Sequence, residues 1–158
     1  MRKINIPNLG DITIKNIIFD INGTLQFKGK IDANLVLRFQ DLKKYYNIYL
    51  VSSDTRGNLR EIAKKLEVDF IKINASSIND AESKLAELDR LGPEITVAVG
   101  NGNNDVMMLK NAVIGICIMG AEGASSKCLL NSDVVFHDPI SAIDFLLDEK
   151  MMIATLRT

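Results

Sequence analysis

The sequence has few of the residues that usually bind transition metals. Its 158 residues include one histidine, His137, and two cysteines, Cys117 and Cys128, which do not form a C-x-x-C pair. A zinc site of the common cysteine and histidine types is therefore not expected. We expect both cysteines to be reduced and largely packed in the interior.

Long apolar runs and a strong charge of either sign are also missing. No stretch approaches the length of a transmembrane span, and residues 1–5 lack the apolar segment of a signal peptide. A cytoplasmic protein without a membrane partner is therefore expected. The formal net charge of −1 gives no indication of a nucleic-acid partner. Without a repeat, linker or low-complexity tract, we expect one domain over residues 1–158.

Apolar periodicity predicts strands that alternate with helices along most of the chain. A β-hairpin is expected over residues 2–14. Further strands are predicted at residues 16–19, 48–51, 70–73, 95–99, 114–118 and 134–136. Helices are predicted at residues 33–46, 56–66, 78–91, 105–111, 124–130 and 140–147. This alternation predicts an α/β fold with a mostly parallel six-stranded sheet and helices on both of its faces.

A carboxylate followed by a turn ends the first of these buried strands. Asp20 comes directly after residues 16–19, and Gly23 and Thr24 follow it. In open α/β sheets, ligands bind at this end of the strands. Gly23 allows backbone N–H groups to turn toward an anion, and Thr24 adds a hydroxyl donor. Asp20 could attack phosphorus as a nucleophile or simply cap a turn, and this segment alone does not separate the two.

A second polar cluster follows the strand predicted at residues 95–99. Residues 100–105 read Gly-Asn-Gly-Asn-Asn-Asp and open the next predicted helix. One interpretation is a glycine turn in which Asn104 is the helix N-cap. A dinucleotide-binding loop is a weaker interpretation, because the third glycine of G-x-G-x-x-G is absent.

Taken together and in this order, these segments resemble the haloacid dehalogenase (HAD) superfamily of phosphohydrolases over nearly the whole chain. Residues 20–25 are similar to its first motif, D-x-D-G-T-L, and residues 50–54 to its second, an apolar strand that ends in Ser or Thr. Lys84 stands at the place of the third-motif lysine. Residues 100–105 resemble the fourth motif, G-D-G-x-N-D. The closest resemblance is to the phosphorylation domain of P-type ATPases and its small soluble relatives, which implies a Rossmann-like three-layer sandwich.

The resemblance implies a Mg²⁺-dependent phosphohydrolase that forms an aspartyl-phosphate intermediate on Asp20. Lys84 would neutralise charge on Asp20 and the phosphoryl group. Asp20, Asp105 and the backbone carbonyl of Asn22 would bind Mg²⁺, which prefers such oxygen ligands. The implied phosphate-binding residues are Gly23, Thr24, Ser52, Ser53 and Lys84.

Two departures from the family motifs bear on activity. Asn22 stands where the family has the Asp that acts as general acid and base, and an amide cannot transfer a proton at neutral pH. P-type ATPases carry Thr there, and their leaving group needs little protonation. We therefore expect Asn22 to limit turnover and to favour good leaving groups. Asn101 replaces the usual fourth-motif Asp, which should weaken Mg²⁺ binding, although its amide oxygen could still bind the ion.

The sequence leaves no room for the cap domain that many HAD enzymes insert. Residues 26–30 are only a tight hairpin, and residues 74–83 are too few for an insertion. The resemblance thus implies a capless member, whose open site a second subunit could cover. We expect a homodimer or homotetramer, with the apolar residues 151–154 as a candidate contact.

Two functions remain open at this point. The first is hydrolysis of a small phosphorylated substrate or a nucleotide. The alternative is a catalytically weakened HAD fold that serves as a phosphate-binding or regulatory module. Asn22 and Asn101 favour the alternative. The retained core argues against it, namely Asp20, Ser52, Lys84 and Asp105. Arg56, next to the second motif, could contact substrate or be a solvated residue at a helix start.

Overall fold

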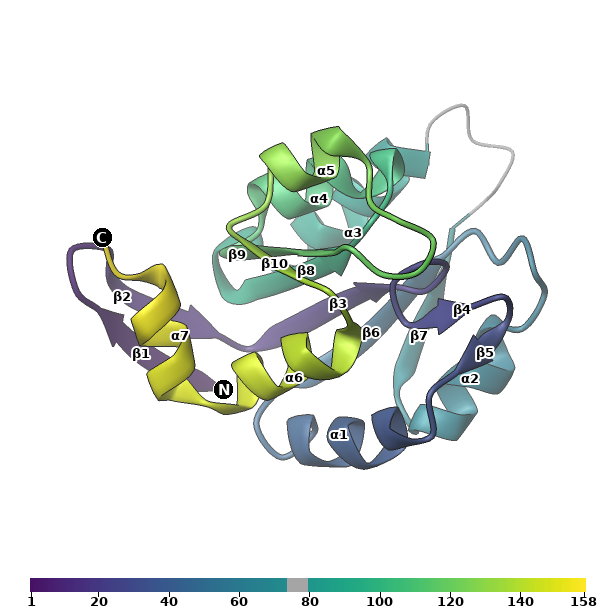
Figure 1. Cartoon of the computed structure of the whole chain (residues 1–158), viewed down its shortest axis with the longest axis horizontal. Coiled ribbons are helices and arrows are strands. Elements are labelled where there is room, and N and C mark those ends of the chain that lie inside the picture. Colours follow the sequence, from purple (N-terminus) through teal and green to yellow (C-terminus); the bar gives the residue numbers. More distant parts are fainter. Residues whose placement is uncertain (74–79) are drawn as a thin grey trace.

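A six-stranded parallel sheet forms the middle layer of the molecule, and helices cover both of its faces (Figure 1). The computed structural model describes residues 1–73 and 80–158. In spatial order the strands are β10 (Val134–Phe136), β9 (Ile114–Ile118), β8 (Thr96–Gly100), β3 (Asn16–Asp20), β6 (Asn47–Ser52) and β7 (Asp69–Lys72). All neighbouring pairs in this sheet are parallel. The predicted α/β three-layer architecture is confirmed.

The strand order reverses beside β3. The chain runs from β3 outward through β6 and β7, then returns to β8 on the other side of β3 and continues to β9 and β10. Phe19 pairs with Val99, and Asp20 pairs with Val51. Because ligands bind where the strand order reverses, this topology favours a site between the carboxyl ends of β3 and β8.

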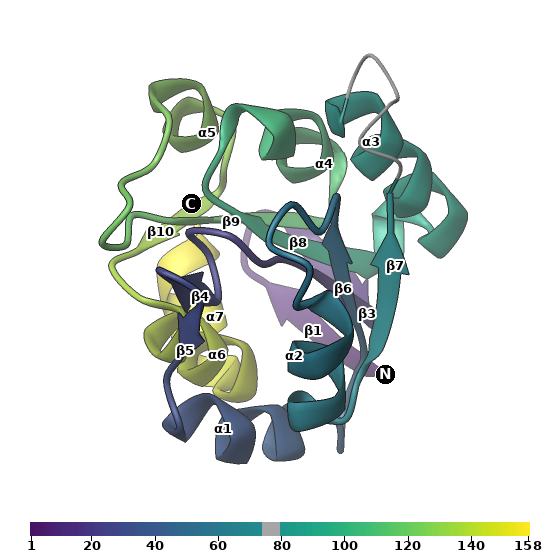
Figure 2. The same ribbon diagram turned by 90° about the vertical axis from the view of Figure 1, so that its right-hand side faces the viewer.

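The two helical layers cover different sides of the sheet (Figures 1 and 2). One layer contains α1 (Asn34–Leu42), α2 (Leu59–Leu66) and α6 (Pro139–Leu147). The other contains α3 (Asp80–Leu91), α4 (Val106–Asn111) and α5 (Ser126–Leu130). Each layer has its own apolar cluster beneath it, because the central strands are buried on both faces. Both cysteines are free thiols in the second cluster, as expected.

Two hairpins lie outside the main sheet. The predicted N-terminal hairpin consists of β1 (Arg2–Ile6) and β2 (Gly10–Ile14). The tight hairpin after Asp20, which we call the flap, consists of β4 (Gln26–Phe27) and β5 (Lys30–Ile31). Short 3₁₀ turns precede β8 (η1, Pro93–Ile95) and α4 (η2, Asn103–Asp105). No separate cap domain is present among the described residues, and part of the predicted insertion point, residues 74–79, lies outside them.

The last helix, α7 (Glu149–Leu156), was not predicted. The side chain of Asp148 accepts hydrogen bonds from the backbone N–H groups of Lys150 and Met151, which is a helix N-cap. Met152 is buried in the core, and α7 packs on β1. Within residues 151–154, Met152 therefore packs in the chain's own core, whereas Met151 is exposed.

Several predicted helix boundaries were wrong by one to four residues, and the helix predicted at 124–130 begins at Ser126. The helix predicted at 33–46 ends at Leu42, and the one predicted at 56–66 begins at Leu59. The helix predicted from residue 105 begins at Val106, after the turn η2. Residues 78–79, the predicted start of α3, are outside the described part. No helix in the described ranges is long and apolar enough to cross a membrane.

Candidate active site

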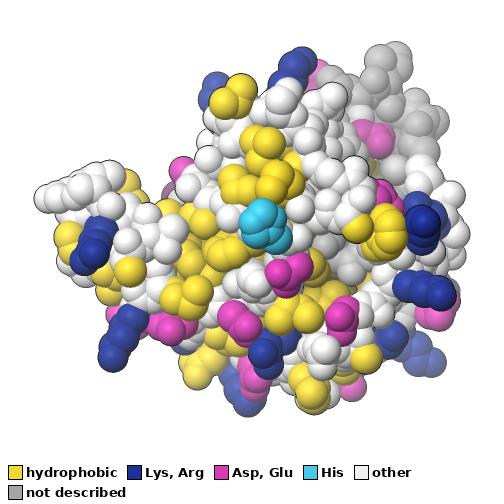
Figure 3. Space-filling model, viewed as in Figure 1, with side chains coloured by type: hydrophobic (Ala, Val, Ile, Leu, Met, Phe, Trp, Pro, Cys, Tyr) yellow, Lys and Arg dark blue, Asp and Glu magenta, His cyan; other side chains and the backbone are white. Residues whose placement is uncertain are grey.

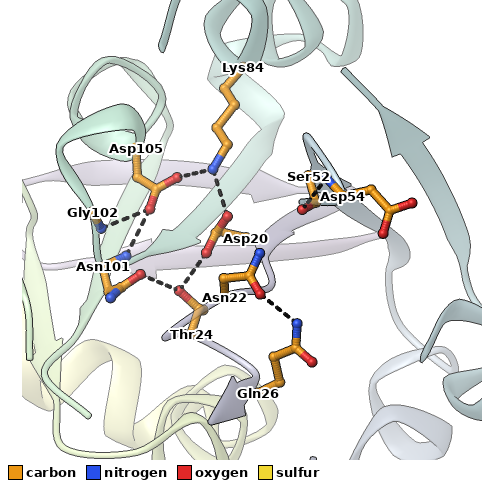
Figure 4. Close-up of polar contacts among 10 residues, drawn as sticks. All are labelled: Asp20, Asn22, Thr24, Gln26, Ser52, Asp54, Lys84, Asn101, Gly102 and Asp105. Atoms are coloured by element: carbon orange, nitrogen blue, oxygen red, sulfur yellow. Dashed lines mark hydrogen bonds and ion pairs between the residues drawn. The ribbon is translucent and has the colours of Figure 1, made fainter. Parts of the chain in front are cut away.

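A buried lysine joins two buried carboxylates at the carboxyl ends of β3 and β8. The Nζ atom of Lys84, on α3, lies 2.6 Å from Oδ1 of Asp20 and 2.5 Å from Oδ1 of Asp105 (Figure 4). The exposed fraction is 1% for Lys84, 5% for Asp20 and 0% for Asp105. Three residues far apart in the sequence thus share one ion-pair cluster, as the motif order predicted.

The pKa values in this cluster reflect burial together with the neighbouring charges. Burial, followed by repulsion from Asp105, raises the pKa of Asp20 to about 7, although Lys84 opposes the shift. Burial opposes the charge on Lys84, but the attraction of Asp20 and Asp105 raises the pKa of the lysine above its usual range. When both carboxylates are ionised, the single ammonium leaves one negative charge in excess, which favours an additional cation here.

The turn after β8 holds Asp105 in place. Its Oδ2 atom accepts hydrogen bonds of 2.9 Å from the backbone N–H groups of both Asn101 and Gly102. A Cβ atom on Gly100 would lie only 2.5 Å from Cγ of Asp105, so that position requires glycine. The glycines of the predicted cluster therefore let the carboxylate fold back against its own turn.

Asn101 connects the two motif loops. Its Oδ1 atom lies 3.2 Å from the Thr24 hydroxyl, and its Nδ2 donates to the backbone oxygen of Gly123 at 3.1 Å. The Thr24 hydroxyl also lies 3.2 Å from Oδ2 of Asp20. Gly23 has φ +82°, and a Cβ on it would approach Asn101 Nδ2 to 2.3 Å. Both polar atoms of the Asn101 amide thus have protein partners.

Ser52 ends β6 next to Asp20, where the second motif predicted it. It is buried, and its Oγ accepts a hydrogen bond of 3.0 Å from the backbone N–H of Asp54. Asp54, at φ 57°, accepts from the backbone N–H of Leu59 at 2.9 Å and pairs with Lys72. The N-capping contact at the start of α2 therefore comes from Asp54 and not from Ser52.

Asn22 takes part in a polar chain that sequence reasoning missed. Its Oδ1 accepts hydrogen bonds from Nε2 of Gln26 at 2.6 Å and from Nε of Arg56 at 3.0 Å. Gln26 in turn accepts from Nδ2 of Asn58 at 3.0 Å, and Arg56 pairs with Glu122 at 3.7 Å. Arg56 is exposed, as in one of the two alternatives, but it precedes α2 and is not part of the helix. These partners come from three loops, and no local pattern indicated them.

An open cavity of about 300 Å³ lies over this cluster. Six predicted residues line it, namely Asp20, Asn22, Ser52, Ser53, Lys84 and Asn101. Gly23 and Thr24 instead line a neighbouring cavity of about 310 Å³ under the flap. A larger groove of about 590 Å³ contains none of the predicted residues, because it lies by Asn47 and Asp69, where β6 and β7 begin. We therefore take the cavity of about 300 Å³ over Asp20 as the candidate active site.

The residues present could hold a divalent cation of the hard, oxygen-binding kind. The Asp20 carboxylate contacts the Lys84 ammonium through Oδ1 and lies 3.2 Å from the Thr24 hydroxyl through Oδ2, and carboxylate oxygens are ligands of this kind. The described ranges contain no group of three or more His, Cys, Asp or Glu side chains that could hold a metal ion. Amides, Asn22 and Asn101, stand at the two positions where the resemblance implies further carboxylates. The cluster therefore offers two carboxylates and an excess negative charge.

Comparison with known families agrees with this geometry. The model of the family described as haloacid dehalogenase-like hydrolase matches residues 27–112, which include Ser52, Lys84 and Asp105. The chain belongs to this family of hydrolases. An uncharacterized protein of Methanocaldococcus jannaschii is 50% identical over 74 residues, which cover 46% of this chain and 80% of that protein.

Solved structures with the same fold include several phosphatases. A 3-deoxy-D-manno-octulosonate 8-phosphate phosphatase from Moraxella catarrhalis, in complex with magnesium, phosphate and KDO, has a TM-score of 0.70 at 15% identity, covering 91% of this chain and 94% of that one. The cobalt-bound Haemophilus influenzae phosphatase has a TM-score of 0.65 at 14% identity, over 91% and 90% of the two chains. A phospho-aspartyl intermediate analogue of phosphoserine phosphatase has a TM-score of 0.63 at 18% identity, over 84% and 99%. At these identities the similarity shows the fold alone.

Proposed function

We propose that this protein is a Mg²⁺-dependent phosphohydrolase that acts on small phosphorylated substrates through an aspartyl-phosphate on Asp20. The observation that carries the proposal is the contact of Lys84 with both Asp20 and Asp105 in a buried cluster under an open cavity. A lysine with 1% exposure is costly unless paired, and here the pairing places it beside the nucleophile.

The first chemical step is transfer of the phosphoryl group to Asp20. An oxygen of Asp20 forms a bond to phosphorus while the bond to the leaving oxygen breaks, and that oxygen departs with the electron pair. Lys84 balances the charge of Asp20 and of the phosphoryl oxygens, and the Ser52 hydroxyl donates to one of them. Water then attacks phosphorus, the bond to Asp20 breaks with its electron pair returning to the carboxylate, and inorganic phosphate leaves with the protons of the attacking water.

Asp20, Asp105 and the backbone carbonyl of Asn22 would hold Mg²⁺ in this proposal. The bound ion would neutralise charge on the nucleophile and on the phosphoryl group. The excess negative charge of the cluster supports this assignment. Asn101 contributes by tying the fourth-motif turn to Thr24 and Gly123, not through a free carboxylate.

A panel of phosphate esters, acyl phosphates and ATP, assayed with Mg²⁺, tests the proposal. We expect turnover of at least one substrate, and loss of that turnover in Asp20→Asn. A matched control is Asp69→Asn, an exposed aspartate at the start of β7. Beryllium fluoride with Mg²⁺ should place a phosphoryl mimic on the Asp20 carboxylate. Unchanged turnover in Asp20→Asn would refute the mechanism.

The alternative is a phosphate-binding or regulatory module with the same fold. It is supported by the side chains of Asn22 and Asn101, which both have protein partners and lack an acid/base function. This reading expects phosphate or beryllium fluoride to bind without turnover of any substrate in the panel.

A further inference from the structure

Arg56 fixes which way the Asn22 amide points. Its Nε lies 3.0 Å from Oδ1 of Asn22, and arginine can only donate. The amide oxygen must therefore face Arg56 and Gln26, and the NH₂ group must face away from them. Figure 4 shows the Asn22 nitrogen on the side of Asp20 and its oxygen on the side of Gln26. Asn22 thus offers hydrogen-bond donors, and no transferable proton, to a group above Asp20.

The guanidinium lies next to Asn22, one of the residues that line the cavity; Thr55 also lines it, and Arg56 itself does not. The Arg56 side chain is 43% exposed, and its acidic partner, Glu122, is 3.7 Å away with 31% exposure. A pair at that distance and exposure is weak. A positive charge beside Asn22 is therefore available to a second anion that enters the cavity.

We propose that Arg56 is a specificity-determining residue that binds leaving groups carrying a negative charge of their own, as in phosphoanhydrides. The inference rests on the proposed phosphoryl transfer to Asp20. In-line displacement sends the leaving group away from Asp20 and into the cavity. Asn22 lines this cavity, and Arg56 lies next to Asn22. A phosphate or diphosphate leaving group suits both residues, because it departs without protonation and pairs with a guanidinium in bidentate fashion.

Pyrophosphate and p-nitrophenyl phosphate separate this role from general catalysis. Their leaving groups have similar basicity, but only that of pyrophosphate carries additional charge. Arg56→Gln should lower kcat/KM for pyrophosphate by about 10- to 100-fold, the range for a hydrogen bond to a charged group, and leave p-nitrophenyl phosphate nearly unchanged. Arg56→Lys should recover part of the loss.

Two further variants sharpen the test. Glu122→Gln removes the competing carboxylate and should lower KM for pyrophosphate. Arg60→Gln is the matched control. Arg60 is an exposed arginine on α2 and lines the groove of about 590 Å³ where β6 and β7 begin, away from Asp20. Arg60→Gln should change kcat/KM for neither substrate. An equal loss on both substrates in Arg56→Gln would overturn the proposal and leave Arg56 with a purely positioning role toward Asn22.

Binding measurements keep the inference testable apart from turnover. Methylenediphosphonate cannot be hydrolysed, so its affinity can be compared with that of inorganic phosphate by calorimetry in the presence of Mg²⁺. Arg56→Gln should weaken binding of the diphosphonate about tenfold or more and leave the affinity for phosphate unchanged. If no substrate is hydrolysed but this difference holds, the proposed function fails while the anion site stands. Equal affinities in wild type and Arg56→Gln would refute the site.

Discussion

At the scale of single residues, the site combines buried charge with two amides at positions where the family has carboxylates. Asp20, Asp105 and Lys84 keep the nucleophile and its charge partners together. Asn22 and Asn101 instead bind other protein groups, in the flap, the loop at Arg56 and the turn at Gly123. The motifs predicted the positions of Asn22 and Asn101, but they did not predict these hydrogen-bond partners.

The raised pKa of Asp20 predicts a pH-dependent cost in stability. Its pKa is about 7 when folded and near 3.8 when unfolded, so between these values the folded state holds the proton more tightly. The contribution of Asp20 to stability is thus full below pH 4 and is lost as the pH rises through about 7. Without divalent cations, Asp20→Asn should be more stable than wild type above pH 7, on the order of 2–4 kcal/mol.

Thermal unfolding in EDTA at pH 4 to 8 measures this difference. The melting temperatures of Asp20→Asn and wild type should converge toward pH 4 and separate toward pH 8. Asp69→Asn, on the exposed start of β7, serves as the control with a flat difference. A constant offset for Asp20→Asn across the whole range would show that Asp20 ionisation does not destabilise the fold.

Restoring a carboxylate at Asn22 should raise turnover of substrates with poor leaving groups. A placed acid/base typically contributes about 10²–10⁴-fold. We expect Asn22→Asp to reach only part of this range, because Arg56 donates to this side chain and favours the ionised form of an acid. Alkyl phosphates should gain most, and acyl phosphates or p-nitrophenyl phosphate least.

The comparison requires that the Asn22→Asp variant folds normally, which circular dichroism can establish. Asn103→Asp places the same change on an exposed residue of η2 and should leave all rates unchanged. If neither class of substrate responds to Asn22→Asp, proton transfer does not limit this protein, and the binding-module alternative gains support.

At the scale of elements, short turns set the geometry of the site. The flap and the turn before it place Thr24 and Gln26 near Asp20 and Asn22. The sequence predicted this tight hairpin from residues 26–30. Helix ends were less predictable. The apolar stripe of α1 continues to Tyr46, beyond the end of the helix at Leu42, whereas residues 56–58 carry no apolar side chain that would mark the start of α2. The N-cap residue Asp148 was a local signal for α7, but its apolar stripe is short.

Two glycines with similar backbone angles allow a controlled test of the turn before the flap. Gly23 and Gly29 have φ +82° and +78°, but only Gly23 would place a Cβ against Asn101, at 2.3 Å. Each substitution to alanine should lower the free energy of unfolding by roughly 1–2 kcal/mol, because alanine disfavours the left-handed backbone. Gly23→Ala should cost more and also lower activity, because it displaces Asn101.

Urea unfolding of the two glycine variants, together with their turnover, measures the difference. An equal loss of stability in both, with normal activity, would show that Asn101 moves aside without consequence for the site.

At the scale of the whole molecule, the cavity over Asp20 is open to solvent. Among the described residues no cap domain shields it, and water exclusion strengthens charge interactions at such a site. Hydrophobic side chains gather near the middle of the face in Figure 3, with basic and acidic ones interspersed. The tip of the flap exposes Phe27, and α7 exposes Met151, each at 42%.

We therefore expect self-association as a dimer or tetramer. Light scattering over a range of concentrations measures the molar mass directly, and a monomer at every concentration would contradict the prediction. Phe27→Ser and Met151→Ser, compared in the same experiment, would show whether the flap or α7 lies in the contact. Loss of activity together with loss of assembly would identify the flap surface as the cover of the site.

The sequence by itself determined the alternation of strands and helices, and with it the parallel sheet. It also placed Asp20 and the turn at residues 100–105 at strand ends, because buried strands and their polar ends are local patterns. The tertiary structure decided the rest. Lys84 looks like any exposed helix lysine until partners 64 and 21 residues away bury it. The contact of Arg56 with Asn22 likewise exists only once β3 and β6 are paired, because contacts between distant loops leave no periodic trace in a sequence.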